Sequence, residues 1–266
     1  MNSRHFKVLS CLALCAGSVA GVSSAAEGSP WSVAVYAGDA FSGSGTFRNP
    51  DTAAIANLGT FDPKLAGNAG TLRLDKLRYH EAYHNRFSTA VELGYALNEN
   101  LQLFGRFGYD ARQGRARDIG TLSSAALTSP QQVVAHFDNS DSRGLEAGAR
   151  YLWTATPEWH PYVAVSLGAT HTDDINARLD VKNTGIDIRQ VRFAQSGTTF
   201  SQSFETGVEY DPSPRLGLRL SVRANHIGTP PSARDPQLTA LGFNSGDDAG
   251  SRVDYPISIA GVYRFD

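Results

Sequence analysis

The chain has 266 residues, enough for one large domain or two small ones, and a formal net charge of −2 at neutral pH. A charge so close to zero gives no electrostatic basis for binding nucleic acid. The only cysteines, Cys11 and Cys15, lie in an apolar run near the N-terminus. The rest of the chain can therefore form neither a disulfide framework nor a thiolate metal site.

Residues 1–26 are predicted to be a secretory signal peptide. Arg4 and Lys7 precede an apolar run from Val8 to about Ala20, and small residues follow at 23–26, which is the order found in such peptides. Cleavage is expected after residue 26 or one residue earlier, leaving residues 27–266 as one domain. Beyond the signal, no stretch approaches the roughly 18 apolar residues of a membrane helix. If the exported chain is in a membrane, it must cross it as strands.

Apolar residues then recur with period 2, which places them on one face of a strand. In segment 85–97, for example, Val91, Leu93 and Tyr95 alternate with Glu92 and Gly94. In chain order, the alternating segments are 31–41, 85–97, 101–113, 143–153, 159–170, 200–210, 216–225 and 252–265. Each holds about ten residues, the length that a tilted strand needs to cross the hydrocarbon layer.

The connections between these segments alternate in length, which a soluble sandwich has no reason to do. The short ones are 98–100, 154–158 and 211–215, and the long polar ones are about 42–84, 114–142, 171–199 and 226–251. Short periplasmic turns and long outer loops are typical of an outer-membrane barrel. The pattern therefore predicts an eight-stranded, antiparallel, up-and-down transmembrane β-barrel with both termini in the periplasm.

Aromatic residues support this topology, because they gather at the short-turn or terminal ends of the segments and on the apolar face. These residues are Trp31, Tyr95, Tyr151, Trp153, Trp159, Tyr210, Tyr263 and Phe265. Such rings are favoured at a membrane interface, where one side is apolar and the other wet. We expect them to form an aromatic girdle.

The opposite face of the segments holds charges and glycines. The charged residues are Glu92, Arg106, Glu146, Arg150, Glu205, Glu209, Arg219, Arg223 and Arg264. Folding the first hairpin about Glu99 sets Glu92 opposite Arg106. An eight-stranded barrel is just wide enough to be filled by its side chains, so these charges are predicted to form an internal ion-pair network. The alternative is a charged channel or an acid–base site. Glycines on this face would make space for Tyr36, Phe104 and Tyr162.

The sequence at this point resembles the small outer-membrane β-barrel proteins of Gram-negative bacteria, and it is similar to the OmpA-type membrane domain. The resemblance covers about 27–266 and rests on VELGYALNENLQLFGRFGY, LEAGARYLW with WHPYVAVSLGA, FETGVEYDPSPRLGLRL and YPISIAGVYRF. It implies a location in the cell outer membrane, contacts with outer-membrane lipids and with the barrel insertion machinery, and a monomer. It implies no cofactor.

The expected function is non-catalytic: a structural or surface-interaction role through long extracellular loops, with any ligand bound at the first loop. A narrow pore for ions or small solutes is the alternative. A barrel-borne hydrolase is a third hypothesis, because His80-Glu81-Ala82-Tyr83-His84 matches the His-Glu-x-x-His motif of zinc proteases.

That motif requires a helix, on which both imidazoles face one zinc ion, and a third ligand. A helix there is not excluded, but strands follow, and the extended form of the motif would need Gly and His where Phe87 and Ala90 stand. We interpret the match as chance spelling at the outer rim of the second strand, with His80 and His84 on one face. No metal or catalytic residue is therefore assigned.

Overall fold

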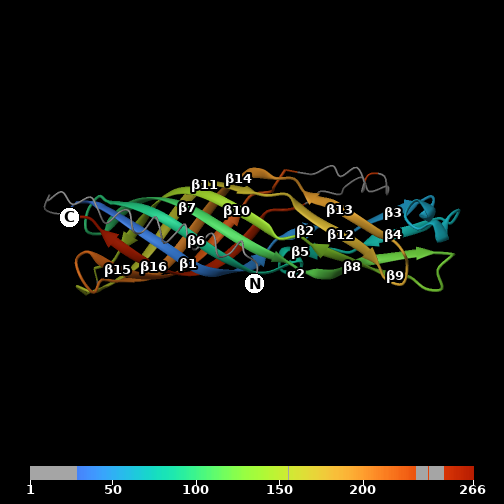
Figure 1. Cartoon of the computed structure of the whole chain (residues 1–266). Coiled ribbons are helices and arrows are strands. Elements are labelled where there is room, and N and C mark those ends of the chain that lie inside the picture. The colour runs from blue at the N-terminus through green and yellow to red at the C-terminus, as the bar shows by residue number, and fades with distance from the viewer. Residues whose placement is uncertain (1–28, 155, 232–238, 240–248) are drawn as a thin grey trace.

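The computed structural model describes residues 29–154, 156–231, 239 and 249–266 (Figure 1). The predicted signal peptide lies outside the described residues, as does much of the connection 226–251. Figure 1 shows an elongated molecule in which long tilted strands occupy one half and a second set of strands continues from one end of them.

Eight long strands form a closed antiparallel barrel in the order β1-β16-β15-β14-β11-β10-β7-β6. Their bounds are Trp31–Ser44 (β1), Tyr83–Ala96 (β6), Leu101–Gly114 (β7), Ser140–Leu152 (β10), Trp159–Thr172 (β11), Gly197–Tyr210 (β14), Leu216–Ile227 (β15) and Arg252–Arg264 (β16). The barrel closes where Ser32 lies opposite Arg264. The predicted eight-stranded barrel is confirmed. The short-turn ends agree with the predicted ranges to within one residue, and the other ends run up to three residues further.

Three of the long connections continue as strands beyond the barrel, and we call residues 45–82, 115–139 and 173–196 the distal extension. One sheet in it has six strands, in the order β13-β12-β9-β8-β4-β3, and another pairs β2 with β5. The bounds are Thr46–Arg48 (β2), Asp51–Ile55 (β3), Gly70–Leu74 (β4), Leu77–Arg78 (β5), Ala116–Ser124 (β8), Gln131–Phe137 (β9), Ile175–Val181 (β12) and Asp187–Ala194 (β13).

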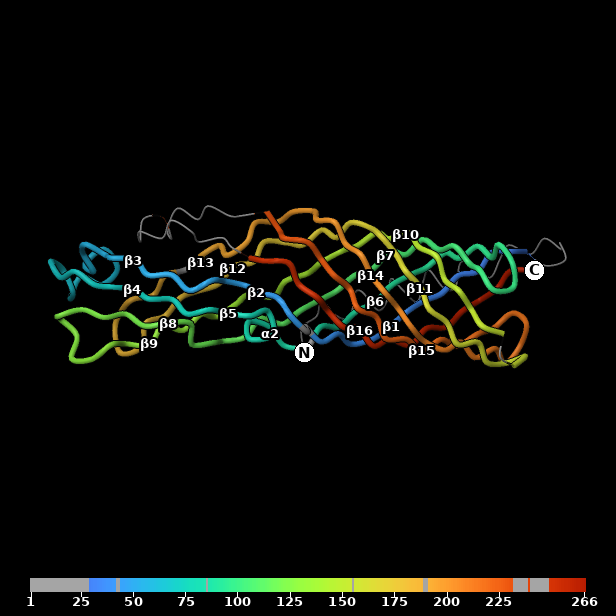
Figure 2. The backbone as a smooth tube through the Cα atoms, turned by 180° about the vertical axis from the view of Figure 1, so that it is seen from behind, coloured from blue at the N-terminus to red at the C-terminus, as the bar shows by residue number. Residues whose placement is uncertain are grey.

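The distal extension also contains the short 3-10 helices Leu58–Thr60 (η2) and Pro63–Leu65 (η3) and the one-turn helix Tyr79–Ala82 (α2). Among the residues that the structure describes, no helix is long and apolar enough to cross a membrane. Figure 2 shows the extension from behind, at the end of the molecule remote from the C-terminus. These segments were predicted only as long polar connections, so their regular strand structure is a finding of the tertiary fold.

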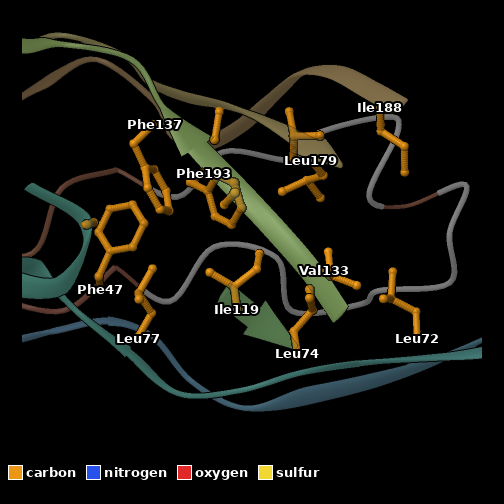
Figure 3. Close-up of a cluster of buried hydrophobic side chains, with 14 of the residues drawn as sticks. Phe47, Leu72, Leu74, Leu77, Ile119, Val133, Phe137, Leu179, Ile188 and Phe193 are labelled. Carbon is orange, nitrogen blue, oxygen red and sulfur yellow. The ribbon is translucent and has the colours of Figure 1, made fainter. Parts of the chain in front are cut away.

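A large hydrophobic core lies in the distal extension and not in the barrel. Phe47 is central to it, with ring centroids 5.2 Å from Tyr79, 5.5 Å from Phe137 and 5.8 Å from Phe193. Figure 3 shows Phe47, Phe137, Phe193 and Ile119 pointing toward one another from different strands. The core unites all three connections, because its members come from each of them.

Large hydrophobic side chains that are exposed show the opposite distribution. Those identified in the described residues all lie on the barrel strands or their short turns, as at Leu145 (66% exposed), Phe200 (59%) and Ile259 (58%). A continuous apolar outer wall of this kind is stable in a lipid environment, where it costs nothing to expose it.

Candidate functional site

The middle of the barrel interior is organised around Glu92. Its carboxylate accepts hydrogen bonds from three guanidinium groups, those of Arg106 (2.7 Å), Arg150 (2.9 Å) and Arg219 (2.9 Å). The Tyr36 hydroxyl also donates to it, at 3.1 Å. Glu92 is 2% exposed. A charge buried this deeply is stable only when it is paired, and here both carboxylate oxygens have guanidinium partners.

Glu205 and Glu209 of β14 extend this network. Glu205 accepts from Arg106 at 2.6 Å and from the Tyr162 hydroxyl at 2.8 Å. Glu209 accepts from Arg219 at 2.5 Å. In the register of the β14–β15 pair, Glu209 lies directly opposite Arg219. The shared arginines therefore link neighbouring carboxylates into one network.

Arg264 ties the end of the network to the turn after β14. It donates to Glu209 and, at 2.7 Å, to Asp211. Burial raises the pKa of the Asp211 carboxyl, even though Arg264 donates to it. The groups joined in this network are four carboxylates and four guanidiniums: Glu92, Glu205, Glu209 and Asp211 with Arg106, Arg150, Arg219 and Arg264. Their charges balance.

The two remaining predicted interior charges form a separate pair. Arg223 donates to Glu146 at 2.9 Å, and the Ser166 hydroxyl donates to the same carboxylate at 3.0 Å. Beside them is a cavity of about 20 Å³. That is room for about one water molecule. The nine predicted interior charges thus all lie inside the barrel and none on the lipid face, seven of them in the network around Glu92 and two in the Arg223–Glu146 pair.

A third charged layer, which the sequence analysis missed, lies where the barrel meets the distal extension. Asp254 of β16 accepts from Arg86 (2.6 Å) and Arg112 (2.8 Å), and Arg252 approaches it to 3.3 Å. Arg86 also pairs with Asp110 at 3.1 Å. The sequence does carry a signal for this layer. Arg86 is an even number of residues from Glu92 and therefore lies on the same face of β6, and Arg112 shares a face of β7 with Arg106 in the same way. Arg86 and Arg112 lie within the predicted strand ranges, near their outer ends, but were not among the predicted interior charges.

Glycines make room for the interior aromatic rings. A Cβ atom at Gly148 would lie 2.6 Å from Cζ of Phe104, and one at Gly207 would lie 2.7 Å from the Tyr162 hydroxyl. Both distances are too short for any side chain. The packing of the inward rings of Phe104 and Tyr162 therefore requires glycine at these two positions, in agreement with the prediction that glycines make space for them.

The aromatic residues at the short-turn ends lie on the outer wall in neighbouring pairs. Trp31 and Tyr95 have ring centroids 4.8 Å apart, and those of Trp159 and Tyr210 are 4.6 Å apart. Tyr151 packs with Trp153, and Tyr263 with Phe265. All eight residues predicted for the girdle thus take part in such pairs. They lie at one end of the barrel, as an interfacial girdle would.

The His80–His84 segment is not one continuous helix. Residues 79–82 form α2, and β6 begins at Tyr83, so His80 is on a helical turn and His84 on a strand. The interpretation of the whole segment as an extended rim is thus wrong for its first half. Glu81 accepts from the Arg78 backbone N–H at 2.7 Å and therefore caps this turn. In the described residues, no group of three potential metal ligands occurs.

The outer surface of the distal extension is polar, with several exposed ion pairs. Arg178 pairs with Asp187 at 2.7 Å, and Lys182 with Asp118 at 3.2 Å. Exposed pairs of this kind contribute little stability. They offer charged groups of both signs to a partner.

Comparisons with known proteins agree with this architecture. The family model described as "Outer membrane protein beta-barrel domain" matches residues 9–249. No curated protein sequence matches the chain significantly. Among solved structures, it is similar to Neisserial surface protein A, with 16% identity, a TM-score of 0.43, and coverage of 90% of this chain and 100% of that one.

Two further structures show the same level of similarity. For Ail, the attachment invasion locus protein of Yersinia pestis, solved with the heparin analogue sucrose octasulfate, identity is 13%, the TM-score 0.38, and coverage 88% and 99%. For OprG from Pseudomonas aeruginosa, identity is 9%, the TM-score 0.40, and coverage 89% and 97%.

The family match spans most of the chain, and the closed barrel with its apolar outer wall is the structure that such a family requires. The protein is therefore located in the outer membrane of a Gram-negative cell. The chain belongs to the outer-membrane protein β-barrel domain family.

Proposed function

We propose that this barrel is a non-catalytic protein with a structural or surface-interaction role, and that the distal extension lies outside the cell and binds its partner. The described ends of the barrel, Trp31 and Arg264, would then lie at the periplasmic side with the short turns. Its other partners would be outer-membrane lipids and the insertion machinery, and it would act as a monomer.

The observation that carries this proposal is the hydrophobic core of the distal extension. A binding surface held by its own core is preorganised, so little conformational entropy is lost when a partner binds. Hydrogen bonds of Asp62 also fix the first connection of the distal extension to the third. The Asp62 carboxylate accepts from the backbone N–H groups of Lys64 (2.9 Å) and Gly185 (3.1 Å), which ties the first connection to the third.

The first connection, residues 45–82, is proposed to carry the main binding surface. It is the longest of the three connections in the extension. Exposed charged groups such as Lys64 and Arg73 project from it. Connections carried on a rigid scaffold are where binding residues concentrate.

The interior ion pairs favour a closed barrel over the alternative narrow pore. Buried, mutually paired arginines and glutamates fill the cross-section around Glu92. The hydrolase hypothesis gains no support, because Glu81 is occupied as a helix cap.

The proposal is tested with a photo-crosslinking residue placed at Lys64 or Arg73 in whole cells. The matched control carries it at Glu99, in a short turn at the other end of the barrel. We expect macromolecules from outside the cell to be captured from the two extension positions and not from Glu99. Capture of periplasmic components at Lys64 or Arg73 would contradict the orientation. Absence of specific capture at both would contradict the binding role.

A further inference from the structure

A furrow of about 560 Å³ crosses the outer wall of the barrel over strands β10, β11, β14 and β15. This volume is in the range of sites that hold small ligands. Two rows of outward side chains line it, and the strand register fixes both. One row runs Ala149, Val165, Phe204, Ala224, and the other runs Ala147, Leu167, Gln202, His226.

Small side chains make the depression. Ala147 and Ala149 lie between the exposed Leu145 and Tyr151 on β10, and Ala224 follows Val222 on β15. On the rest of the wall, outward positions are mostly large and apolar. The furrow thus exists because small side chains stand where the rest of the lipid-facing wall has large ones.

The furrow climbs through the membrane. Ala149 is two residues from Tyr151 in the girdle, a rise of about 5 Å for a tilted strand. His226 is ten residues from Leu216, at the start of β15, a rise of about 25 Å. The apolar band of such barrels is about 25 Å tall. One end of the furrow therefore lies near the short turns, and the other reaches the distal edge of the band.

The two ends differ in chemistry. The lower end offers only the apolar side chains of Ala147, Ala149, Val165 and Leu167. The upper end presents Gln202 and His226 as a cross-strand pair on the lipid face. The Nδ1 atom of His226 is buried and has no hydrogen-bond partner among the described residues. A polar atom in apolar surroundings, whether buried or facing lipid, is costly unless something pairs with it.

We propose that an acyl chain of lipopolysaccharide lies in this furrow, with a polar group at the head of the chain bonded to His226 and Gln202. An outer-leaflet lipid has its polar part at the outer edge of the band and its tail toward the middle, which is the order of groups in the furrow. A lipid of the other leaflet would present them in reverse. The inference uses the orientation proposed above but not the binding role of the distal extension.

The test uses the full chain, purified in detergent, stripped of lipid and incubated with lipopolysaccharide or with phosphatidylethanolamine. Native mass spectrometry then counts the lipids retained by each barrel. The double variant Ala147→Leu/Ala149→Leu fills the lower furrow, and His226→Leu removes the polar end. The control is Ala37→Leu, at an exposed alanine of β1 outside the furrow.

We expect the wild type and Ala37→Leu to retain lipopolysaccharide, and the other two variants to bind it about tenfold more weakly. A gel shift between unheated and boiled samples verifies folding. If the double variant does not fold, His226→Leu decides alone, because leucine is favourable on the lipid face. Equal retention by all variants, a preference for phosphatidylethanolamine, or self-association lost in His226→Leu would overturn the proposal. Retention of lipopolysaccharide is measured on the full chain without a partner of the extension, so it can succeed while capture at Lys64 and Arg73 fails, or the reverse, which separates this site from the proposed function.

Discussion

The barrel and the distal extension have opposite radial polarity, although both are antiparallel sheet and the chain passes directly from one to the other. In the barrel, Glu92 and Arg219 are buried and Leu220 is exposed. In the extension, Phe47 and Leu74 are buried and Arg73 is exposed. The difference shows that alternation alone does not say which face is outside. The surrounding solvent decides it, lipid for one half and water for the other.

The largest effect is expected from removing the charge at the barrel centre. Glu92→Leu leaves Arg106, Arg150 and Arg219 buried without their common partner, which should lower the free energy of unfolding by about 3–5 kcal/mol. Urea unfolding in detergent micelles measures it. Glu99→Gln, in an exposed turn, is the control and should have no effect. Unchanged stability in Glu92→Leu would mean that the interior is hydrated enough to release these charges.

A cavity in the hydrophobic core of the distal extension should lower stability by a similar amount, but the effect should be confined to the extension. Phe47→Ala removes a ring that packs on Tyr79, Phe137 and Phe193, a loss of about 3–5 kcal/mol for a buried aromatic. Limited proteolysis should then cut the distal extension while the barrel keeps its gel shift on heating. Arg73→Ala, at an exposed position, serves as control. Simultaneous loss of both halves would show that they fold as one unit.

Placing an arginine on the outer wall of the barrel, and another on the exposed face of the extension, compares the lipid and water environments directly. Leu220 is four residues from Leu216, about 10 Å up a band about 25 Å tall. Leu220→Arg should therefore destabilise the barrel by about 2–4 kcal/mol. Thr71→Arg, on the exposed face of β4, should be neutral. Equal effects at the two positions, measured by unfolding in lipid vesicles, would contradict the assignment of lipid to one and water to the other.

The smallest effect concerns the turn at the junction of the two regions. Glu81→Gln weakens the cap on the Arg78 backbone N–H, and such caps contribute about 1 kcal/mol. Hydrogen exchange at residues 78–82 should speed up, with global stability nearly unchanged. Zinc content after dialysis should be the same in His84→Ala as in wild type. A zinc content that fell with His84→Ala would revive the metal-site hypothesis, because this imidazole would be a ligand.

Much of the barrel could be predicted, because each strand crosses a slab of fixed thickness and begins or ends at a short turn that is visible in the sequence. Period-2 alternation separated each strand into an apolar and a charged face, the aromatic residues marked one end of the strands, and the short turns set the register. Folding about Glu99 set Glu92 opposite Arg106, and the structure has that pair. The upper layer around Asp254 was not predicted, although Arg86, Arg112 and Asp254 lie within the expected strand ranges and on their inward-facing side. Which charges meet in this layer depends on strands far apart in the chain.

The distal extension could not be predicted in the same way. Its strands are short, and β12 pairs with β9 and β4 with β8, each from a different connection. A short strand of this kind has no local signal of its partner. The furrow also escaped notice, because Ala147, Ala224 and His226 come from two strands that are distant in sequence.

The sequence by itself determined the number of barrel strands, their apolar and charged faces and the aromatic residues at their short-turn ends, because these depend on local periodicity in a slab of fixed thickness. Only the tertiary structure decided which arginine shares which carboxylate, that three connections join in one core, and where the wall is hollow. Those features depend on which strands pair with one another across long stretches of the chain, and local periodicity does not specify that pairing.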